Sequence, residues 1–404
     1  MQNTRKFQTA IIGGGASGLF LAAMLAQKGE SVAVFERSDR VGKKLSATGN
    51  GQGNITNENV KERGYFSSSF GGVERIESMV KAYDNDALCT FFRTLGLLVF
   101  YDERGRGYPT SRQASALTDA LRLYIEKAGV STLVSTQIVS LAKKGEGFLL
   151  TSASGDKYEA ENVVLCTGGK AAKNFGTDGS AYGLAQAFGH TLTALYPSLV
   201  QLKTDTATIK TLKGIRVFDS KVTAAWTEKG ATQTHTVCGD IIFTDYGVSG
   251  DAIFRLSAFI AAKQDATLSI DFLPDVDENT LVALLKNKKK AIADLADSER
   301  LCGIVNNQVG RAIMKTLAGA SDERVAKAVK AFPLQVKGSL GFDYAQVTKG
   351  GIPLNEVDDN LQSKKAKGLY FAGEILDVDG ECGGFNLQWA YSSACVVANA
   401  LCEK

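Results

Sequence analysis

The 404-residue sequence predicts an α/β protein interrupted by two inserted segments, and three observations support this fold class. Both ends of the chain alternate buried strands with apolar helices, which is typical of a parallel sheet covered by helices. Residues 198–273 are rich in Thr and Val in short alternating runs, a pattern that favours strands. Residues 277–331 are dominated by Ala, Leu, Lys and Asp with helical periodicity. We therefore expect a discontinuous α/β domain of residues 1–195 and 345–404, a β-rich subdomain of residues 196–275 and 332–344, and a helical subdomain of residues 276–331.

The individual elements follow from the same patterns. The α/β domain should open with a strand over Thr9–Ile12, a helix over Leu19–Gln27 and a second strand over Val32–Glu36. Further helices are expected over residues 74–95 and 112–128, and further strands over residues 135–141, 147–152 and 163–166. The helical subdomain should contain helices over residues 278–295, 301–317 and 323–331. Strands over residues 332–340, 345–348 and 368–372 and an apolar helix over residues 384–401 should complete the chain.

Composition excludes several classes of protein. With 46 Lys plus Arg against 43 Asp plus Glu, the net charge of +3 does not indicate a nucleic-acid or polybasic membrane protein. Two His and seven Cys without a CxxC pair argue against a metal centre, an Fe–S cluster or a secreted disulfide framework. The uncharged run over residues 9–27 is broken by glycines, so we interpret it as part of the fold and not as a leader or membrane span. We therefore expect a cytoplasmic protein with no metal, no nucleic-acid partner and no membrane contact.

The first motif is a glycine-rich turn between the first strand and the first helix. Gly13-x-Gly15-x-x-Gly18 is followed by an acidic residue, Glu36, at the end of the next strand. In a dinucleotide-binding turn Gly13 permits the tight turn, Gly15 lets the backbone approach a pyrophosphate, and Gly18 allows close helix–strand packing. The helix N-terminus favours an anion, and Glu36 can hold a ribose 2′-hydroxyl. The alternative is a glycine-rich turn in an α/β protein that binds no ligand.

The second motif spans residues 40–57 and contains four glycines and three asparagines. Glycine allows backbone N–H groups to converge, and Asn tolerates left-handed backbone, so this composition suits a loop wrapped against a ligand. Lys43 or Lys44 could neutralise a pyrophosphate. An ordinary surface loop with solvated lysines is the alternative.

Two further segments directly follow predicted strands. Val163–Cys166 runs into Thr167-Gly168-Gly169, which fits a return crossing near a dinucleotide. The strand over residues 368–372 runs into an acidic glycine-rich loop and then an apolar helix that begins near Gly384. Carboxylates there can hold ribityl or ribose hydroxyls, and the helix N-terminus can stabilise negative charge on a flavin. The carboxylate spacing does not fit an EF-hand.

Together the motifs resemble the two-dinucleotide-binding-domain FAD flavoproteins. More specifically, the chain resembles the HI0933-like family, also called the YhiN or BaiN/RdsA flavoproteins, along almost its whole length. The resemblance includes residues 106–111, 176–182, 189–190, 197–199 and 243–250 and the C-terminal GEILDVDG and GGFNLQWA. It implies a Rossmann-like FAD-binding domain with an inserted β-barrel-like subdomain and a small helical subdomain. In the second motif the family carries Thr-Gly-Gly-Gly-Arg-Cys-Asn, whereas this chain has Gln52 and Gly53 in place of the Arg and Cys.

We therefore expect non-covalently bound FAD. No second complete GxGxxG is present, so a dedicated NAD(P)H domain is not expected, although NAD(P)H could still reduce the flavin by transient binding. The residues expected to bind FAD are Gly13, Gly15, Ala16, Ser17, Gly18, Glu36, Arg37, Lys43, Lys44, Leu45, Asn50, Gly51, Asn54, Val139, Thr167, Gly168, Gly169, Gly373, Glu374, Asp377, Gly384, Phe385, Asn386 and Leu387.

The expected function is an FAD-dependent oxidoreductase that transfers hydride through flavin N5 to or from a small organic substrate. Tyr246, Tyr196 and Tyr391 are candidate substrate-contacting or proton-donating residues, and each can instead be a packing residue. Three alternatives stay open: a non-catalytic flavin-binding redox or regulatory protein, an oxygen-using amine oxidase of the aminoacetone type, and an NAD(P)-only dehydrogenase. The last leaves the C-terminal acidic loop unexplained. The sequence does not indicate the substrate or the oligomeric state.

Overall fold

The computed structural model describes residues 5–62, 64–263 and 265–403, which form two compact units. Unit 1 comprises residues 1–196 and 347–404, and unit 2 comprises residues 197–346. The chain passes from one unit to the other near β11 (Tyr196–Ser198) and again before β18 (Val347–Lys349). An α/β unit built from both ends of the chain is the arrangement that the sequence predicts.

Unit 1 is built on a sheet with the strand order β7-β2-β1-β10-β9-β8, and β19 also pairs with β10. These strands are β1 (Arg5–Ile12), β2 (Val32–Phe35), β7 (Ser131–Leu133), β8 (Ile138–Lys144), β9 (Gly147–Ser152), β10 (Lys157–Leu165) and β19 (Leu369–Phe371). The pairs β1–β2, β2–β7, β1–β10 and β10–β19 are parallel, whereas β8 and β9 form an antiparallel hairpin. The carboxyl ends of β1, β2, β10 and β19 therefore meet at one edge of the sheet, where α/β proteins bind ligands.

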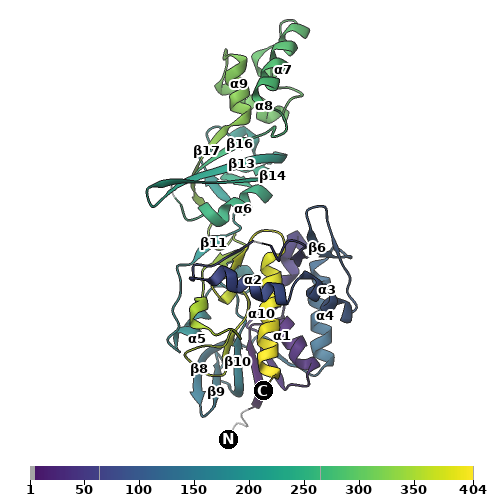
Figure 1. The fold of residues 1–404 in the computed structure, drawn as a ribbon, viewed down its shortest axis with the longest axis vertical. Helices are drawn as coiled ribbons and strands as arrows, with labels where there is room; N and C mark the ends of the chain where they lie inside the picture. Colours follow the sequence, from purple (N-terminus) through teal and green to yellow (C-terminus); the bar gives the residue numbers. More distant parts are fainter. Residues whose placement is uncertain (1–4, 63, 264, 404) are drawn as a thin grey trace. The chain divides into compact units, whose positions relative to one another are not determined.

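The helices of unit 1 bury their apolar faces against this sheet and each other. They are α1 (Ala16–Gln27), α2 (Gly72–Ala82), α3 (Asn85–Thr94), α4 (Ala114–Lys127), α5 (Tyr182–Gln186) and α10 (Phe385–Cys402). Figure 1 shows α10, drawn in yellow, running beside α1. Both helices are apolar almost all round, and Leu19, Leu21 and Val397 are fully buried in a single core cluster.

Short strands complete unit 1: β3 (Thr56–Asn57), β4 (Tyr65–Phe66), β5 (Val99–Tyr101), β6 (Arg106–Pro109) and β20 (Asp379–Gly380). One expectation needs correction here. Residues 74–95, predicted as one helix, form α2 and α3 with a break at Tyr83 and Asp84. The side chain of Asp84 accepts hydrogen bonds from the N–H groups of Asp86 and Ala87, so it caps a new helix.

Unit 2 contains a closed barrel with the strand order β12-β15-β14-β13-β16-β17. The strands are β12 (Leu202–Thr204), β13 (Arg216–Glu228), β14 (Ala231–Phe243), β15 (Gly247–Ser249), β16 (Thr267–Asp271) and β17 (Phe332–Ser339). The expectation of β structure throughout residues 198–273 missed one helix, α6 (Asp251–Ile260). Its apolar residues Ala252, Ile253, Leu256 and Ile260 follow helical spacing and are buried on the barrel.

The remaining helices of unit 2 are α7 (Glu278–Ala291), α8 (Asn307–Thr316) and α9 (Asp322–Lys330). They lie in the segment that the sequence predicts as a helical subdomain. Leu281 of α7, Val309 of α8 and Val325 of α9 belong to the same hydrophobic cluster as Ile270 of the barrel. The barrel and these helices therefore share one core, which explains why they form a single unit.

Along the described part of the chain, no helix has the length and apolar character that crossing a membrane requires. Within those same residues, no group of three or more His, Cys, Asp or Glu side chains is arranged to hold a metal ion.

Candidate cofactor-binding site

The predicted glycine-rich turn connects β1 to α1 at the ligand-binding edge of the sheet. Gly13 has a φ of +109°, and a β-carbon there would lie 2.4 Å from the carbonyl oxygen of Cys166 at the end of β10. A β-carbon on Gly18 would lie 2.0 Å from the carbonyl oxygen of Gly13. Both contacts exclude a side chain, so these two glycines are required by the turn and by the packing of α1 against it.

Gly15 differs from its neighbours because nothing in the protein requires a glycine there. It precedes α1 with φ −81° and ψ −164°, a conformation open to any residue. A β-carbon on Gly15 would meet no atom within 4 Å among the described residues beyond its chain neighbours. The space beside Gly15 lies at the N-terminus of α1, where backbone N–H groups and the helix dipole favour an anion. This cradle fits a pyrophosphate.

Glu36 lies directly after β2 and faces the turn. Its Oε2 accepts a hydrogen bond from Gly14 N (2.9 Å), and its Oε1 accepts one from Ser38 N (2.7 Å). A carboxylate oxygen can accept more than one hydrogen bond, so Glu36 keeps capacity for a ribose hydroxyl. Two backbone donors hold it beside the pyrophosphate cradle.

The second glycine-rich segment lies against the same turn. Gly42 N donates to Gly14 O (2.7 Å), and a short 3-10 segment over Leu45–Gly51 follows, in which Leu45 is buried. Asn50 and Gly51 have left-handed backbone, with φ values of +54° and +83°. The side-chain amide of Asn54 donates to Thr56 O and Gly107 O, so Asn54 fixes the course of this loop.

The three predicted basic residues engage acidic partners. Lys44 Nζ lies 2.8 Å from Glu374 Oε2, and this pair joins the second segment to the loop after β19. Lys43 pairs with Asp39 (2.6 Å), four residues before it in the sequence. Arg37 pairs with Asp178 (2.9 Å) in the loop before α5. Lys44 and Glu374 thus place one cation and one anion beside the sheet edge.

The end of β10 supplies a buried hydroxyl without a hydrogen-bond partner among the described residues, Thr167 Oγ1. The adjacent Gly169 is tightly enclosed, because a β-carbon there would lie 2.4 Å from Thr348 Oγ1 and 2.9 Å from Glu374 Oε1. Gly168 has left-handed backbone with a φ of +68°. A buried hydroxyl that bonds to nothing is costly, so Thr167 calls for a polar ligand or water.

The C-terminal segment packs against α1 and begins α10. Gly373 has a φ of +79°, and a β-carbon there would lie 2.6 Å from Ser17 Oγ. Ser17 Oγ donates to Ala372 O (3.3 Å), and Ala16 is the first residue of α1. These contacts bring the fourth predicted segment of the site onto the glycine-rich turn.

Two predicted ligands of this segment are engaged within the protein. Asp377 is buried, and its Oδ2 accepts hydrogen bonds from Ser68 N (3.0 Å) and from the hydroxyl groups of Ser67 and Ser68. The side chain of Asn386 exchanges two hydrogen bonds of 2.8 Å with the backbone of Gly380. Both side chains thereby hold the loop that leads to α10.

The first turn of α10 contains the other predicted residues, Phe385 and Leu387. Gly384 has a φ of +104°, and a β-carbon there would lie 2.1 Å from Thr56 O. The ring of Phe385 packs on Tyr65 with ring centres 5.7 Å apart. The N–H groups of this first turn have no partner within the helix, as at any helix start, and can stabilise negative charge.

Sequence reasoning missed a second buried hydroxyl, that of Tyr182. Tyr182 is the first residue of α5 and is 4% exposed, and its hydroxyl has no hydrogen-bond partner among the described residues. Burial and the nearby carboxylates of Glu374 and Asp377 raise the pKa of this phenol, so it stays protonated and can donate. The sequence offered one signal for Tyr182, because residues 176–182 are among those that resemble the family.

Val139 and Tyr196 are largely exposed, and Tyr246 belongs to the other unit. Val139 is on β8 and is 51% exposed. Tyr196, at the boundary of unit 1, is 43% exposed. Tyr246 belongs to unit 2, where its carbonyl oxygen accepts from Thr204 N (3.1 Å).

Tyr391 is buried inside the core of unit 1. Its ring contacts Phe20 and Phe91 with ring centres 5.4 and 5.7 Å away. Burial and a hydrogen bond with Cys395 raise the pKa of its phenol. These contacts give Tyr391 a packing role.

The geometry therefore fits a dinucleotide. Gly15 provides a cradle at a helix N-terminus, and Thr167 and Tyr182 provide buried hydroxyl groups without partners among the described residues. Glu36 and Lys44 add one acceptor and one cation. A long polar ligand with a pyrophosphate and several hydroxyl groups matches this set.

Comparison with known proteins agrees with this geometry. The family model described as "HI0933-like protein Rossmann domain" matches residues 7–400. The chain belongs to the HI0933-like family. Its fold is the Rossmann-type FAD-binding fold with an inserted closed barrel.

Relatives and a solved structure match along nearly the whole chain. The HI0933-like chain is 33% identical to a "3-dehydro-bile acid delta(4,6)-reductase" of Clostridium scindens, over 98% of each protein. It is 28% identical to a "Ribosomal RNA dihydrouridine synthase" of Escherichia coli, again over 98% of each. The crystal structure of 3-ketosteroid-delta4-(5alpha)-dehydrogenase from Rhodococcus jostii RHA1 is similar in fold, with a TM-score of 0.53, 16% identity and coverage of 99% of this chain and 98% of that one.

Proposed function

We propose that this protein is an FAD-dependent oxidoreductase that reduces a carbon–carbon double bond conjugated to a carbonyl group in a small organic substrate. This protein belongs to the class of FAD-dependent oxidoreductases. The whole-length similarity to a bile-acid reductase and a dihydrouridine synthase supports the reaction type. In a 3-oxo steroid the 4,6-double bonds are conjugated to the ketone, and in uracil the 5,6-double bond is conjugated to a ring carbonyl. Both named reactions add hydrogen across such a bond.

The residues of the site fit the cofactor that this chemistry needs. Bound FAD supplies hydride transfer at its N5 position. The Gly13–Gly18 turn and the start of α1 would hold the pyrophosphate, and Glu36 would hold the ribose. Tyr182 and Thr167 would donate to oxygens of the cofactor chain, and the first turn of α10 would stabilise negative charge. The observation that carries the cofactor assignment is the open side of Gly15.

A small substrate is favoured over ribosomal RNA. The sequence identity is 33% to the bile-acid reductase and 28% to the dihydrouridine synthase. The net charge is only +3, whereas proteins that bind RNA through its phosphates carry a concentrated positive charge. We therefore infer a small-molecule substrate and no nucleic-acid or membrane partner.

We infer that the electron donor is NADH or NADPH and that it binds transiently. The sequence contains one complete GxGxxG, and FAD would occupy it, so no dedicated nicotinamide domain is needed. We also infer a cytoplasmic location, supported by a cysteine spacing that does not fit a secreted disulfide framework.

The test is a product analysis with the FAD-loaded protein under nitrogen. NADH or NADPH is supplied with either a 3-oxo-Δ4,6 steroid acid or ribosomal RNA that lacks dihydrouridine, and products are identified by mass spectrometry. We expect the steroid to gain two hydrogen atoms per double bond and the RNA to remain unchanged. Reduction of the RNA alone would overturn the assignment to a small substrate. In a separate assay in air-saturated buffer, oxygen consumption with aminoacetone, together with no reduction of either compound under nitrogen, would instead establish the amine-oxidase alternative.

A further inference from the structure

Arg112 stands out in unit 1 because its backbone is held in an unfavourable conformation. It lies between β6 and α4 with a φ of +51°, and its N–H donates to Pro109 O (2.8 Å). Left-handed backbone is uncommon for a residue with a long side chain, and such outliers often occur at functional sites. Glycine or asparagine would suit this turn better, so the arginine side chain must be explained by its contacts.

The guanidinium group of Arg112 rests on a pair of aromatic rings. Phe100 and Tyr108 stack with ring centres 6.0 Å apart and an interplanar angle of 26°. The guanidinium carbon lies 4.4 Å from the ring centre of Phe100 and 5.1 Å from that of Tyr108. Stacking on aromatic faces restricts an otherwise flexible arginine and leaves the edges of its planar fork accessible.

Most donors of this guanidinium are unused within the described part of the chain. One N–H group donates to Gln52 Oε1 (3.1 Å), and no carboxylate there forms an ion pair with Arg112. Arg106, which also borders Tyr108, is by contrast paired with Asp102 (2.7 Å). Arg112 therefore has no ion-pair partner among the described residues and can pair with an added anion.

The charge borders a hollow of about 360 Å³. Its lining contains three cations, two carboxylates and two aromatic rings, so the positive charges outnumber the negative ones by one; these residues are Arg104, Arg106, Arg112, Asp102, Glu103, Phe100 and Tyr101. Its volume falls within the range of about 300 to 1,000 Å³ that small-molecule sites occupy. The hollow suits a compound with an apolar body and an anionic end.

Gln52 links this hollow to the cofactor site. It belongs to the glycine-rich segment that lies on the Gly13–Gly18 turn. Because Arg112 bonds to the side chain of Gln52, a guanidinium group is present at this place although residue 52 carries none. Arg112 therefore supplies the positive charge beside residue 52.

We propose that Arg112 binds a carboxylate on the substrate, in the hollow beside Phe100 and next to the Gln52 segment. The planar fork of arginine matches a carboxylate in two parallel hydrogen bonds. This inference rests on the proposed function, because it names the chemical class of the substrate of that enzyme: an organic acid with an apolar skeleton. Arg112 is a binding residue and takes no part in the hydride transfer.

The test compares a 3-oxo-Δ4 steroid that ends in a carboxylate with its methyl ester. Dissociation constants for both compounds are measured by calorimetry on the FAD-loaded protein, and KM and kcat are measured where turnover occurs. We expect the natural protein to bind the acid about 10- to 100-fold more tightly than the ester, as hydrogen bonds to a charged group allow. Arg112→Ala should remove this preference by raising KM for the acid. The kcat for the acid and the dissociation constant of the ester should change little.

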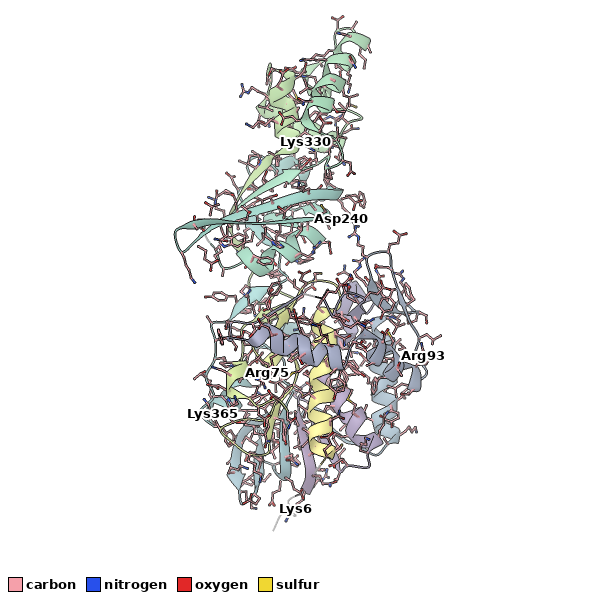
Figure 2. The ribbon with its side chains drawn as sticks, viewed as in Figure 1. Lys6, Arg75, Arg93, Asp240, Lys330 and Lys365 are labelled. Carbon is pink, nitrogen blue, oxygen red and sulfur yellow. The ribbon has the colours of Figure 1, made fainter. Side chains whose placement is uncertain are left out.

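Two further variants separate binding from folding. Arg112→Gly removes the side chain and suits the left-handed backbone, so it should fold at least as well as Arg112→Ala and lose the same preference. Arg93→Ala, at an exposed arginine of α3 that Figure 2 labels, is the matched control and should keep the preference. Gln52→Arg combined with Arg112→Gly should restore most of the preference by returning a guanidinium to the same place.

The outcomes distinguish this proposal from the proposed function. Equal binding of acid and ester by the natural protein, or an unchanged preference in both Arg112 variants, would overturn the role of Arg112. A preference that depends on Arg112 in binding but without reduction of either steroid would support the anion site and contradict the proposed reaction. FAD content and melting temperature are recorded for every variant, so that loss of fold is recognised.

Discussion

Gly18 lies so close to Gly13 that a β-carbon on Gly18 would be 2.0 Å from the Gly13 carbonyl oxygen. Three residues earlier, Gly15 faces open space. The two positions have the same residue type for different reasons. Gly18 is required by the packing of α1 on the turn, whereas we attribute Gly15 to the cofactor that we propose binds there.

This contrast predicts opposite effects of two alanine substitutions. Gly18→Ala should lower the free energy of unfolding by several kcal/mol, because backbone atoms must move to admit the methyl group. Gly15→Ala should change it by no more than about 1 kcal/mol, since the position before α1 accepts alanine without strain. Gly15→Ala should nevertheless weaken FAD binding at least tenfold. Chemical denaturation and flavin titration check both. A Gly15 variant with unaltered FAD affinity would contradict the cradle.

Tyr182→Phe should stabilise the FAD-free protein and weaken FAD binding. Removing a buried hydroxyl that has no hydrogen-bond partner among the described residues is expected to raise the free energy of unfolding by about 1 kcal/mol. Loss of a hydrogen bond to the cofactor should reduce FAD affinity about fivefold to tenfold. Fluorescence titration of the apoprotein and urea denaturation measure the two effects. Tyr158→Phe, near the opposite end of β10, is the control and should leave FAD affinity unchanged. A less stable apoprotein with normal FAD affinity would indicate a purely structural role for Tyr182.

Tyr391→Phe should leave catalysis unchanged. The ring lies in an aromatic cluster with Phe20 and Phe91, and its hydroxyl contacts Cys395. We expect kcat within about twofold of the natural protein and a loss of stability of about 1 kcal/mol from the missing hydrogen bond. Steady-state kinetics and thermal unfolding check this. A kcat reduced tenfold or more at normal stability would restore Tyr391 as a catalytic candidate.

His190 should make the protein less stable in mild acid. It is buried, with Nδ1 2.8 Å from Glu356 Oε2 and Nε2 2.7 Å from Ser363 Oγ. Ser363 Oγ already accepts from Lys365 N and Ala366 N, so its proton points to Nε2 and the ring is neutral. Burial lowers the pKa of His190, although Glu356 opposes the shift.

The unfolded chain therefore takes up this proton at about pH 6.5, before the folded protein does. The free energy of unfolding should fall as the pH drops from 6.5 towards the lowered pKa of His190. Urea denaturation between pH 7.5 and 5.5 measures this slope. His190→Gln, which cannot titrate, should reduce it. An equal slope in both proteins would show that other groups govern acid stability.

Glu356 acts over a more acidic range. Burial alone would raise its pKa, but hydrogen bonds from Lys365, which Figure 2 labels, and from Thr191 and His190 lower it to about 2. The unfolded carboxyl titrates near 4.5, so Glu356 stabilises the fold above that pH, and this contribution is lost as the pH falls from 4.5 to 2. Glu356→Gln should cost about 2 kcal/mol at pH 7. The free energy of unfolding of this variant should also depend less on pH between 4.5 and 3. Denaturation curves across that range measure this dependence.

Local patterns were sufficient to predict the parts of the fold that depend on neighbouring residues. The turn Gly13–Gly18 and the strands beside it followed from spacing, because a tight turn and a buried strand restrict residue type. The helix α6 was missed because ten helical residues stood within a segment rich in strand formers. The shared core of the barrel and α7–α9 could not be foreseen, since it depends on contacts between distant residues.

In the candidate site, too, local patterns predict some residues, whereas others depend on contacts between distant parts of the chain. Gly15 and Glu36 were predicted because the chemistry of a dinucleotide requires them at fixed spacing. The unpaired hydroxyl of Tyr182 and the bond between Arg112 and Gln52 arise only when residues far apart in the sequence meet. Asp377, predicted as a cofactor ligand from its acidic loop, is held by Ser67 and Ser68 in the fold.

The most direct test of the central claim is an anaerobic visible spectrum of the FAD-loaded protein, recorded after NADH or NADPH and again after a 3-oxo-Δ4,6 steroid acid. The account predicts flavin absorbance that one nucleotide bleaches and that the steroid restores in proportion to the amount added. Two results would contradict it. A protein that neither binds FAD nor gains thermal stability from it would refute the cofactor assignment, and bleached flavin that the steroid leaves bleached would refute the proposed reaction.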